Sequence, residues 1–215
     1  MMDRGDIIRT INLKFVAWCF PLVVLALLIS VRFLDAHIAL TVMKILRSYS
    51  FLQNSTSNIP DILFLLVCGG STLLWMNYFY LRRKAIINDL RRFSLLAASA
   101  LPTAYFLKYL CKLLFGRTNT RIWLVESASD RFHWFHGGGN FSGFPSGHMT
   151  VFSAFFAAVW IYYPRYRHIS LGIMLFLTAA LIGTDYHFLS DIIAGAYLGL
   201  LTTCLASIGL KRFDT

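Results

Sequence analysis

Long apolar runs with few charged residues alternate with polar segments along the whole chain, and the run at 93–115 is interrupted near its far end by two lysines, Lys108 and Lys112. The runs predict membrane-crossing helices over about 13–34, 60–81, 93–115, 146–163, 169–188 and 191–210. A helix needs about 20 apolar residues to cross the hydrocarbon core of a bilayer, and most of these runs are close to that length. We therefore expect an all-α integral membrane protein in which residues 1–215 form a single six-transmembrane helix bundle.

The stretch between the first two runs has a different pattern. Apolar residues recur there at helical spacing, and two basic residues lie off the apolar stripe: Ile38, Val42, Ile45 and Leu46, with Lys44 and Arg47. This pattern predicts a short helix in the membrane interface after span one. A cleaved signal peptide is the alternative for the first run. The run is long for such a peptide and no small-residue cleavage pattern follows, so we favour an uncleaved helix.

Composition supports a membrane protein and narrows its partners. Only 14% of residues are charged, against about 25% in soluble domains. The net charge of +10 comes from basic residues placed between the apolar runs, a pattern typical of membrane topology and not of a nucleic-acid-binding face. The four cysteines are isolated in apolar runs, which argues against a disulfide framework or a cysteine metal site.

The basic residues also predict the orientation of the chain. Twelve lie in segments on the side of the two termini: Arg4, Arg9, Lys14, Arg82, Arg83, Lys84, Arg91, Arg92, Arg165, Arg167, Lys211 and Arg212. Only five lie in the opposite, longer loops: Lys44, Arg47, Arg117, Arg121 and Arg131. The positive-inside rule therefore predicts cytoplasmic termini and an outward-facing loop over 116–147.

Three groups of chemically useful residues fall at the outer ends of spans. Lys108 and Lys112 are four apart and share a helix face, although basic residues reaching for the interface are the alternative. Ser146 is a favourable N-cap for the next helix, whose free N–H groups attract anions such as phosphate. His187 and Asp191 are also four apart, so the carboxylate can orient the imidazole, or the two can simply close a turn.

Together these groups match the needs of phosphoryl transfer. Cations and N–H groups hold phosphoryl oxygens, one histidine attacks phosphorus, and His148 is placed to move protons. The sequence has no P-loop and no H-E-x-x-H pattern, so we expect a metal-free route through phosphohistidine, with no cofactor. A metal site made by His133, His136 and His148 is a less favoured alternative, because no carboxylate or cysteine completes it.

The arrangement resembles the type 2 phosphatidic acid phosphatase superfamily of membrane lipid phosphatases. That family carries three motifs, K-x6-R-P, P-S-G-H and S-R-x5-H-x3-D. The second is complete as Pro145-Ser146-Gly147-His148, and His187 with Asp191 ends the third, 39 residues after His148. The resemblance implies that His187 attacks phosphorus, Asp191 orients it and His148 serves the leaving group and then water. It also implies that the phosphoryl group is held by Lys112, Arg117, Ser146 and Gly147.

Two departures from the family pattern concern arginines. Asn119 and Thr120 stand where the first motif has Arg-Pro, and Ala180 and Leu181 stand where the third has Ser-Arg. The phosphate pocket therefore lacks up to two guanidinium groups of the family pattern. We expect Arg117 to replace them with Lys112 beside it, and less favoured substitutes are Lys108 and Arg121.

The resemblance implies a membrane phosphatase that hydrolyses a lipid phosphate or pyrophosphate at the outer face of a bacterial inner membrane. Substrates of the undecaprenyl pyrophosphate, phosphatidate, phosphatidylglycerophosphate or lipid A type fit this expectation. One alternative is a lipid phosphotransferase with a polyprenyl pyrophosphate donor. The other is a non-catalytic lipid-binding membrane protein. The expected partners are the lipid substrate and the bilayer, and no nucleic acid.

Overall fold

The computed structural model describes residues 11–47, 59–126 and 132–213, and helices account for most of them. The elements in chain order are α1 (Leu13–Ile29), the π-helical η1 (Ser30–Leu34), α2 (Asp35–Arg47), α3 (Ile59–Arg83), α4 (Asp89–Phe115), α5 (Thr120–Glu126), α6 (Gly147–Tyr162), the 3-10 turn η3 (Pro164–Tyr166), α7 (Arg167–Gly183) and α8 (Leu189–Phe213). No β-strand occurs in these described ranges, so the prediction of an all-α protein is confirmed.

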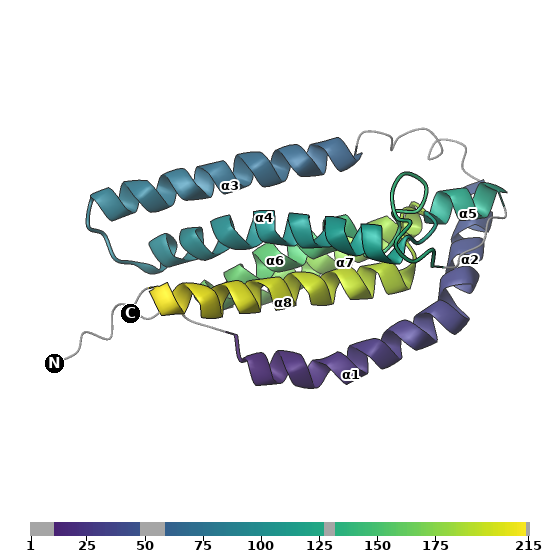
Figure 1. The fold of residues 1–215 in the computed structure, drawn as a ribbon, viewed down its shortest axis with the longest axis horizontal. Coiled ribbons are helices and arrows are strands. Elements are labelled where there is room, and N and C mark those ends of the chain that lie inside the picture. Colours follow the sequence, from purple (N-terminus) through teal and green to yellow (C-terminus); the bar gives the residue numbers. More distant parts are fainter. Residues whose placement is uncertain (1–10, 48–58, 127–131, 214–215) are drawn as a thin grey trace.

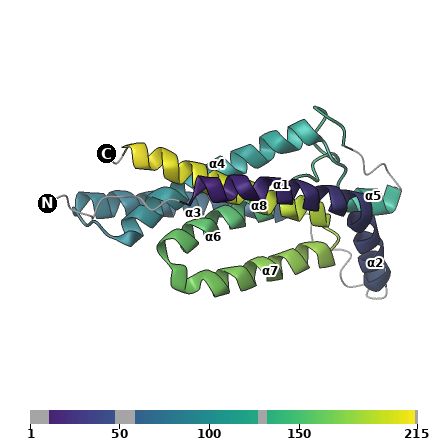
Figure 2. The same ribbon diagram turned by 90° about the horizontal axis from the view of Figure 1, so that it is seen from below.

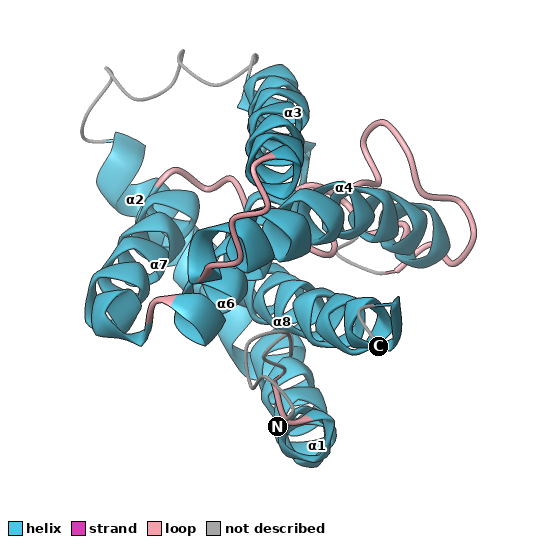
Figure 3. Ribbon diagram, turned by 90° about the vertical axis from the view of Figure 1, so that its left-hand side faces the viewer, coloured by secondary structure: helices cyan, strands magenta, loops and turns pink. Residues whose placement is uncertain are grey.

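The long helices run roughly side by side, with α6 and α8 in the centre of the bundle (Figures 1 and 3). The central pair is flanked by α4, by α1 on the α8 side and by α7 on the α6 side, while α3 packs on the outside of α4. Figure 2 shows α7 set apart on the far side of α6. The loop that precedes α6 and the short α5 lie together at one end of the bundle, and α8 ends at the other (Figure 1).

Among the described residues, four helical stretches are long and apolar enough to cross a membrane: Leu13–Ile45, Ile62–Arg83, Pro164–Gly183 and Leu189–Lys211. Large apolar side chains such as Trp18 (80% exposed) and Phe176 (76%) point away from the bundle, where lipid would cover them. The apolar α6 is only 16 residues long, and α4 carries Lys108 and Lys112. Four of the predicted spans are thus confirmed as candidate spans, and the count of six stays a prediction.

The first helix does not end where the sequence analysis placed its end. The chain stays helical from α1 through η1 into α2, and the axis bends sharply around this junction (Figure 1). A π-helical turn is a recognised cause of such a bend. Residues 35–47 are helical as expected, but a membrane-interface position for them stays a prediction, and 48–58 lie outside the described residues.

Two glycines allow the central pair of helices to approach closely. Gly195 and Gly199 lie one turn apart on α8, on the side that faces α6. A Cβ atom added to Gly195 would lie 2.6 Å from the carbonyl oxygen of Ser146, and one added to Gly199 would clash with the carbonyl oxygen of Thr150. Small residues with this spacing are a common device for packing helices in membranes. Here they fix the start of α8 against the start of α6.

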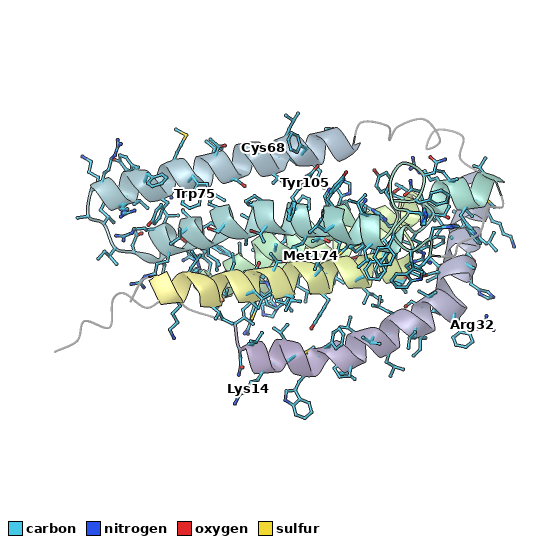
Figure 4. The ribbon with its side chains drawn as sticks, in the orientation of Figure 1. Lys14, Arg32, Cys68, Trp75, Tyr105 and Met174 are labelled. Atoms are coloured by element: carbon cyan, nitrogen blue, oxygen red, sulfur yellow. The ribbon has the colours of Figure 1, made fainter. Side chains whose placement is uncertain are left out.

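Side chains fill the space between the outer helices as well (Figure 4). Tyr105 of α4 lies between α4 and α3, where its ring centroid is 5.6 Å from that of Phe64. Lys14 and Arg32 lie towards opposite ends of the α1–η1 segment. The polar groups that the sequence analysis singled out gather at the other end of the bundle from the α3–α4 turn, and they form the site described next.

Candidate active site

The start of α6 is tied directly to the start of α8. Ser146 caps α6, because its hydroxyl oxygen accepts a hydrogen bond from the Met149 N–H at 3.4 Å. The N–H of the same serine donates to the backbone oxygen of Asp191 at 2.9 Å. This bond joins the P-S-G-H stretch to the His-x3-Asp stretch, so the structure brings together the two groups that the sequence analysis assigned to one site.

His187 and Asp191 lie side by side, as their spacing predicted. Nδ1 of His187 is 3.5 Å from Oδ2 of Asp191, and this nitrogen has no hydrogen-bond partner in the described part of the chain. Oδ2 also accepts the Phe188 N–H at 3.0 Å, which holds the carboxylate across the turn before α8. Catalytic hydrogen bonds are often long in a ligand-free site and shorten in the complex with substrate.

Burial favours the neutral form of the His187 imidazole. The residue is 6% exposed, in the turn between α7 and α8, and burial lowers the pKa of His187 below its ordinary value. The carboxylate of Asp191 opposes this shift, while the positive charge of Lys112 adds to it. A neutral imidazole retains the lone pair that a nucleophile needs, so these surroundings suit attack on phosphorus.

His148 occupies a more open position in the first turn of α6. Its ring is partly exposed and meets the ring of Tyr186 in an edge-to-face contact, with the centroids 5.6 Å apart. The same tyrosine ring is 5.1 Å from the ring of His187. Tyr186 therefore contacts both histidines. One ring comes from the first turn of α6 and the other from the α7–α8 turn, and they differ in their access to solvent.

The two lysines of α4 both act on this region. Lys108 is buried, and its Nζ lies 3.8 Å from the centroid of the Tyr105 ring. A Cβ atom added to Gly147 would lie 3.1 Å from this Nζ, so the ammonium group sits against the first residue of α6. The charge of Lys112 is close enough to act on both His187 and Asp191. Lys108, which the sequence analysis ranked behind Lys112, thus lies against the P-S-G-H turn.

Arg117 is fully buried, and its terminal nitrogens contact carboxylates. Its Nη1 donates to Oδ1 of Asp191 at 2.7 Å, and its Nη2 donates to Oδ2 of Asp35 at 2.8 Å. The guanidinium also lies over the ring of Phe188, 4.3 Å from the centroid. The expectation that Arg117 binds phosphate stays a prediction. In this structure the residue links two acids behind His187.

Asp35 and Ser190 are functional candidates that the sequence analysis missed. The carboxylate of Asp35 accepts hydrogen bonds from the backbone N–H of Ser190 at 3.0 Å and from the Ser190 hydroxyl. Asp35 lies 82 positions before Arg117 and 155 before Ser190, so no local pattern connects them. The available signal was weak: Asp35 is an acidic residue that directly follows the first apolar run, on the predicted outer side.

Arg121 and Asp185 lie beside the site. The guanidinium of Arg121 donates to the carbonyl oxygen of Thr184 at 2.8 Å and lies over the Tyr186 ring. Burial raises the pKa of Asp185 to about 6, although the charge of Arg121 opposes the shift. The geometry thus gives Arg121 a contact with the α7–α8 turn, and its less favoured assignment as a phosphate ligand stays untested.

The histidines of the loop before α6 have local partners. The His133 ring lies 4.5 Å from the Phe141 ring, and Nδ1 of His136 lies 2.7 Å from the carbonyl oxygen of Trp134. Within the described ranges, no three His, Cys, Asp or Glu side chains are arranged to hold a metal ion.

Comparison with known proteins agrees with the motif analysis. The family model described as the PAP2 superfamily matches residues 93–213. A lipid A 1-phosphatase of Rhizobium johnstonii (strain DSM 114642 / LMG 32736 / 3841) is 41% identical over 80 residues, which cover 36% of this chain and 32% of the relative. A lipid A 1-phosphatase of Rhizobium etli (strain ATCC 51251 / DSM 11541 / JCM 21823 / NBRC 15573 / CFN 42) is 42% identical over 80 residues, 36% of this chain and 34% of the relative. The matched stretch thus spans about a third of the length of these curated relatives. No solved structure matches the chain.

Proposed function

Because the chain belongs to the PAP2 superfamily, we propose that it is a membrane phosphatase that hydrolyses a lipid phosphate or pyrophosphate. The observation that carries the proposal is the pairing of His187 with Asp191 at a point where a backbone hydrogen bond ties them to the P-S-G-H turn. Among the lipids that fit the site, the names of the two Rhizobium relatives favour a lipid A type phosphate as the first to test.

The proposed reaction has two steps. Nε2 of neutral His187 attacks phosphorus, a P–N bond forms, and the P–O bond to the leaving group breaks as His148 protonates the leaving oxygen. His148 then takes a proton from water, whose oxygen attacks phosphorus; a P–O bond forms, the P–N bond to His187 breaks, and inorganic phosphate leaves. Asp191 stabilises the positive charge that develops on the imidazole, 3.5 Å away. The electrostatic contribution of a preorganised site is the largest part of such catalysis.

The phosphoryl oxygens need cations and N–H donors. The ammonium group of Lys108 beside Gly147, the nearby Lys112, and the free N–H groups of the first turn of α6 supply them. Ser146 caps that turn, and Arg117 supports Asp191. In this assignment the lysines of α4 replace the arginines that the family motifs would contribute.

A groove next to the histidines fits a lipid tail. A cavity of about 370 Å³ between α6, α7 and α8 is lined mainly by apolar side chains. Met149 and Ile192, which line it, directly follow His148 and Asp191 in the sequence. An acyl or prenyl chain in this groove would leave its phosphorylated head group at the site. The sequence adjacency of these lining residues to His148 and Asp191 supports a lipid over a soluble phosphate ester as the substrate.

The proposed topology keeps the six predicted spans, with α4 and α6 crossing the membrane beside the four longer apolar stretches. The positive-inside rule then puts the termini in the cytoplasm and the site at the outer face of a bacterial inner membrane.

The test is a phosphate-release panel with the purified full chain in detergent. Lipid A, undecaprenyl pyrophosphate, phosphatidate and phosphatidylglycerophosphate are offered separately to the wild type, with and without EDTA. We expect release from at least one lipid, undiminished by EDTA. His187→Ala should release none. His168→Ala, a histidine exposed near the start of α7, should match the wild type and is the control.

Absence of phosphate release from every lipid, or full release by His187→Ala, would contradict the proposal. Phosphorylation of an added acceptor lipid in place of free phosphate would identify a phosphotransferase instead.

A further inference from the structure

Four buried polar residues form one network behind His187. Asp35, Arg117, Ser190 and Asp191 are each at most 1% exposed. Three of them lie within the segment that matches the family model, 93–213, and Asp35 lies well outside it, at the end of the η1 turn. The network therefore connects the N-terminal helices to the proposed catalytic pair.

Arg117 is the central donor of the network, with an acid on either side. Asp35 accepts from Nη2 of Arg117 and, with its other oxygen, from the backbone N–H of Ser190. The Ser190 hydroxyl donates to Asp35 and accepts from Nη1 of Arg117. Nη1 also donates to Oδ1 of Asp191, which leaves Oδ2 of Asp191 facing His187. Asp35 thus holds the guanidinium of Arg117, and this guanidinium in turn holds the carboxylate of Asp191.

The charges of the network explain why a second acid is useful. One guanidinium beside one carboxylate would make a neutral pair, and Asp191 would then do little for a positive imidazole. Because Arg117 is shared between Asp35 and Asp191, the three groups carry a net charge of about −1 in a buried place. That excess negative charge favours the positive imidazole that forms when His187 attacks phosphorus.

The position of Asp35 also suits a carboxylate. It accepts the N–H of Ser190 in the first turn of α8, where the helix dipole favours negative charge. An uncompensated buried carboxylate would be strongly destabilising, so the contacts with Ser190 and Arg117 are needed for this acid to remain there. The side chain of Asp35 is completely buried, which keeps it away from any substrate.

We propose that Asp35 is a positioning residue of this site: it holds Arg117 against Asp191 so that Asp191 stays aligned with His187 and retains its negative character. The proposal rests on the proposed function, because His187 is the nucleophile it serves. It adds the N-terminal helices to the functional unit. A purely structural role, in which Asp35 only fastens α2 to α8, is the competing explanation.

Asp35→Asn separates the two explanations, since it keeps the shape and removes the charge. We expect kcat to fall about 10- to 100-fold, as for other residues that orient a catalytic group, with KM within about twofold of the wild type. The acidic limb of the kcat/KM profile, which reports His187, should move to lower pH because a nearby negative charge is gone. Asp35→Glu should recover part of kcat.

Simple loosening of the packing predicts the opposite pH shift. Burial lowers the pKa of His187, so water entering a loosened site would return it towards its ordinary value and move the acidic limb to higher pH. A shift of the acidic limb to higher pH in Asp35→Asn, or an unchanged kcat in this variant, would overturn the proposal. Asp89→Asn, which removes a carboxylate 3.9 Å from Arg92 at the start of α4, is the matched control and should keep wild-type kinetics.

A second variant keeps the proposal testable if Asp35→Asn does not fold. Ser190→Ala removes the bridging hydroxyl but leaves the charge of Asp35 and its bond to the Ser190 backbone. We expect a kcat loss of about two- to tenfold with an unchanged acidic limb, because the charge of Asp35 and its ion pair with Arg117 remain when the hydroxyl is removed. An unchanged kcat in this variant would contradict the network's role.

Titration of ¹⁵N-labelled histidine by NMR in detergent tests the coupling without any substrate. The His187 signal, assigned with His187→Ala, should titrate at lower pH in Asp35→Asn than in the wild type. If the wild type releases phosphate from no lipid, the proposed function fails, and this titration still decides whether Asp35 acts on His187. Identical titration curves would reject the inference by themselves.

Discussion

The two histidines of the site differ more in their surroundings than in their sequence context. His187 is 6% exposed, lies beside Asp191 and is backed by Arg117 and Asp35. His148 is partly exposed at a helix start and contacts an aromatic ring. A nucleophile must be neutral and oriented, whereas a group that moves protons to a leaving group and from water must reach solvent. The difference in burial thus agrees with the two roles that we propose for these histidines.

The largest expected effect comes from removing the buried histidine. His187→Ala should lower phosphate release by more than about a thousandfold, since the covalent step is lost. Quenching in alkaline detergent, where the P–N bond of phosphohistidine is stable, during turnover of a lipid labelled in the phosphate should trap labelled protein in the wild type and none in this variant. Label on His187→Ala would show that another residue is the nucleophile.

Removing the partly exposed histidine should slow both steps but keep the nucleophile. We expect His148→Ala to lose about 10²- to 10⁴-fold in turnover, the usual contribution of a general acid–base group. With a p-nitrophenyl leaving group, which needs no protonation, the labelled intermediate should still form and should accumulate because water is not activated. If His148→Ala lost labelling equally with poor and with good leaving groups, the separate role of His148 would be refuted.

A smaller effect is expected at the contact between α6 and α8, whose starts lie beside the two histidines. In Gly199→Ala, the added Cβ would clash with the backbone of Thr150, so α8 must move away from α6. Overpacking of this kind costs about 1–3 kcal/mol. Thermal unfolding in detergent should show the loss, and kcat should fall as the two motifs separate.

The matched control lies on the same helix. Gly209 has no atom within 4 Å of an added Cβ, so Gly209→Ala should unfold at or slightly above the wild-type temperature. Equal melting temperatures for the two variants would mean that the close approach of α6 and α8 is not needed.

The smallest effect concerns Asp185, which lies in the α7–α8 turn two residues before His187. Burial raises the pKa of Asp185 from 3.8 to about 6, so the folded protein binds this proton more tightly than the unfolded chain does. The corresponding stabilisation is complete below about pH 3.8 and is lost as pH rises through about 6. Asp185→Asn should therefore melt above the wild type at pH 7, with the difference shrinking towards pH 4. Parallel melting curves across this range would contradict the buried carboxyl.

The helices and one half of the site were readable from local pattern. Apolar runs such as 60–81 predicted helices because backbone polar groups in lipid must pair within their own segment. The observed α3 runs past its predicted end at 81 to Arg83, and the observed α4 begins before its predicted start at 93, at Asp89, since the polar residues Arg82, Arg83 and Asp89 continue the helical turns without belonging to an apolar run. His187 and Asp191 were likewise paired by their spacing alone.

Other parts of the site depended on long-range packing. The sequence ranked Lys108 behind Lys112 because the family motif aligns with the latter, whereas the path of α4 past α6 brings Lys108 against Gly147. Arg117 was expected to face phosphate, and the structure surrounds it with two acids. Motif spacing specifies residue type and order, but it does not show which of several cations meets which carboxylate.

The sequence by itself determined an all-helical chain with membrane-length segments and the P-S-G-H and His-x3-Asp stretches, because these features depend on periodicity and on neighbours within one helical turn. The tertiary structure alone decided that Asp35 joins them. That contact requires the α1–η1–α2 segment to bend over the start of α8, and it unites side chains 82 and 155 positions apart. Bringing such distant charges together depends on the packing of whole helices, which no local pattern encodes.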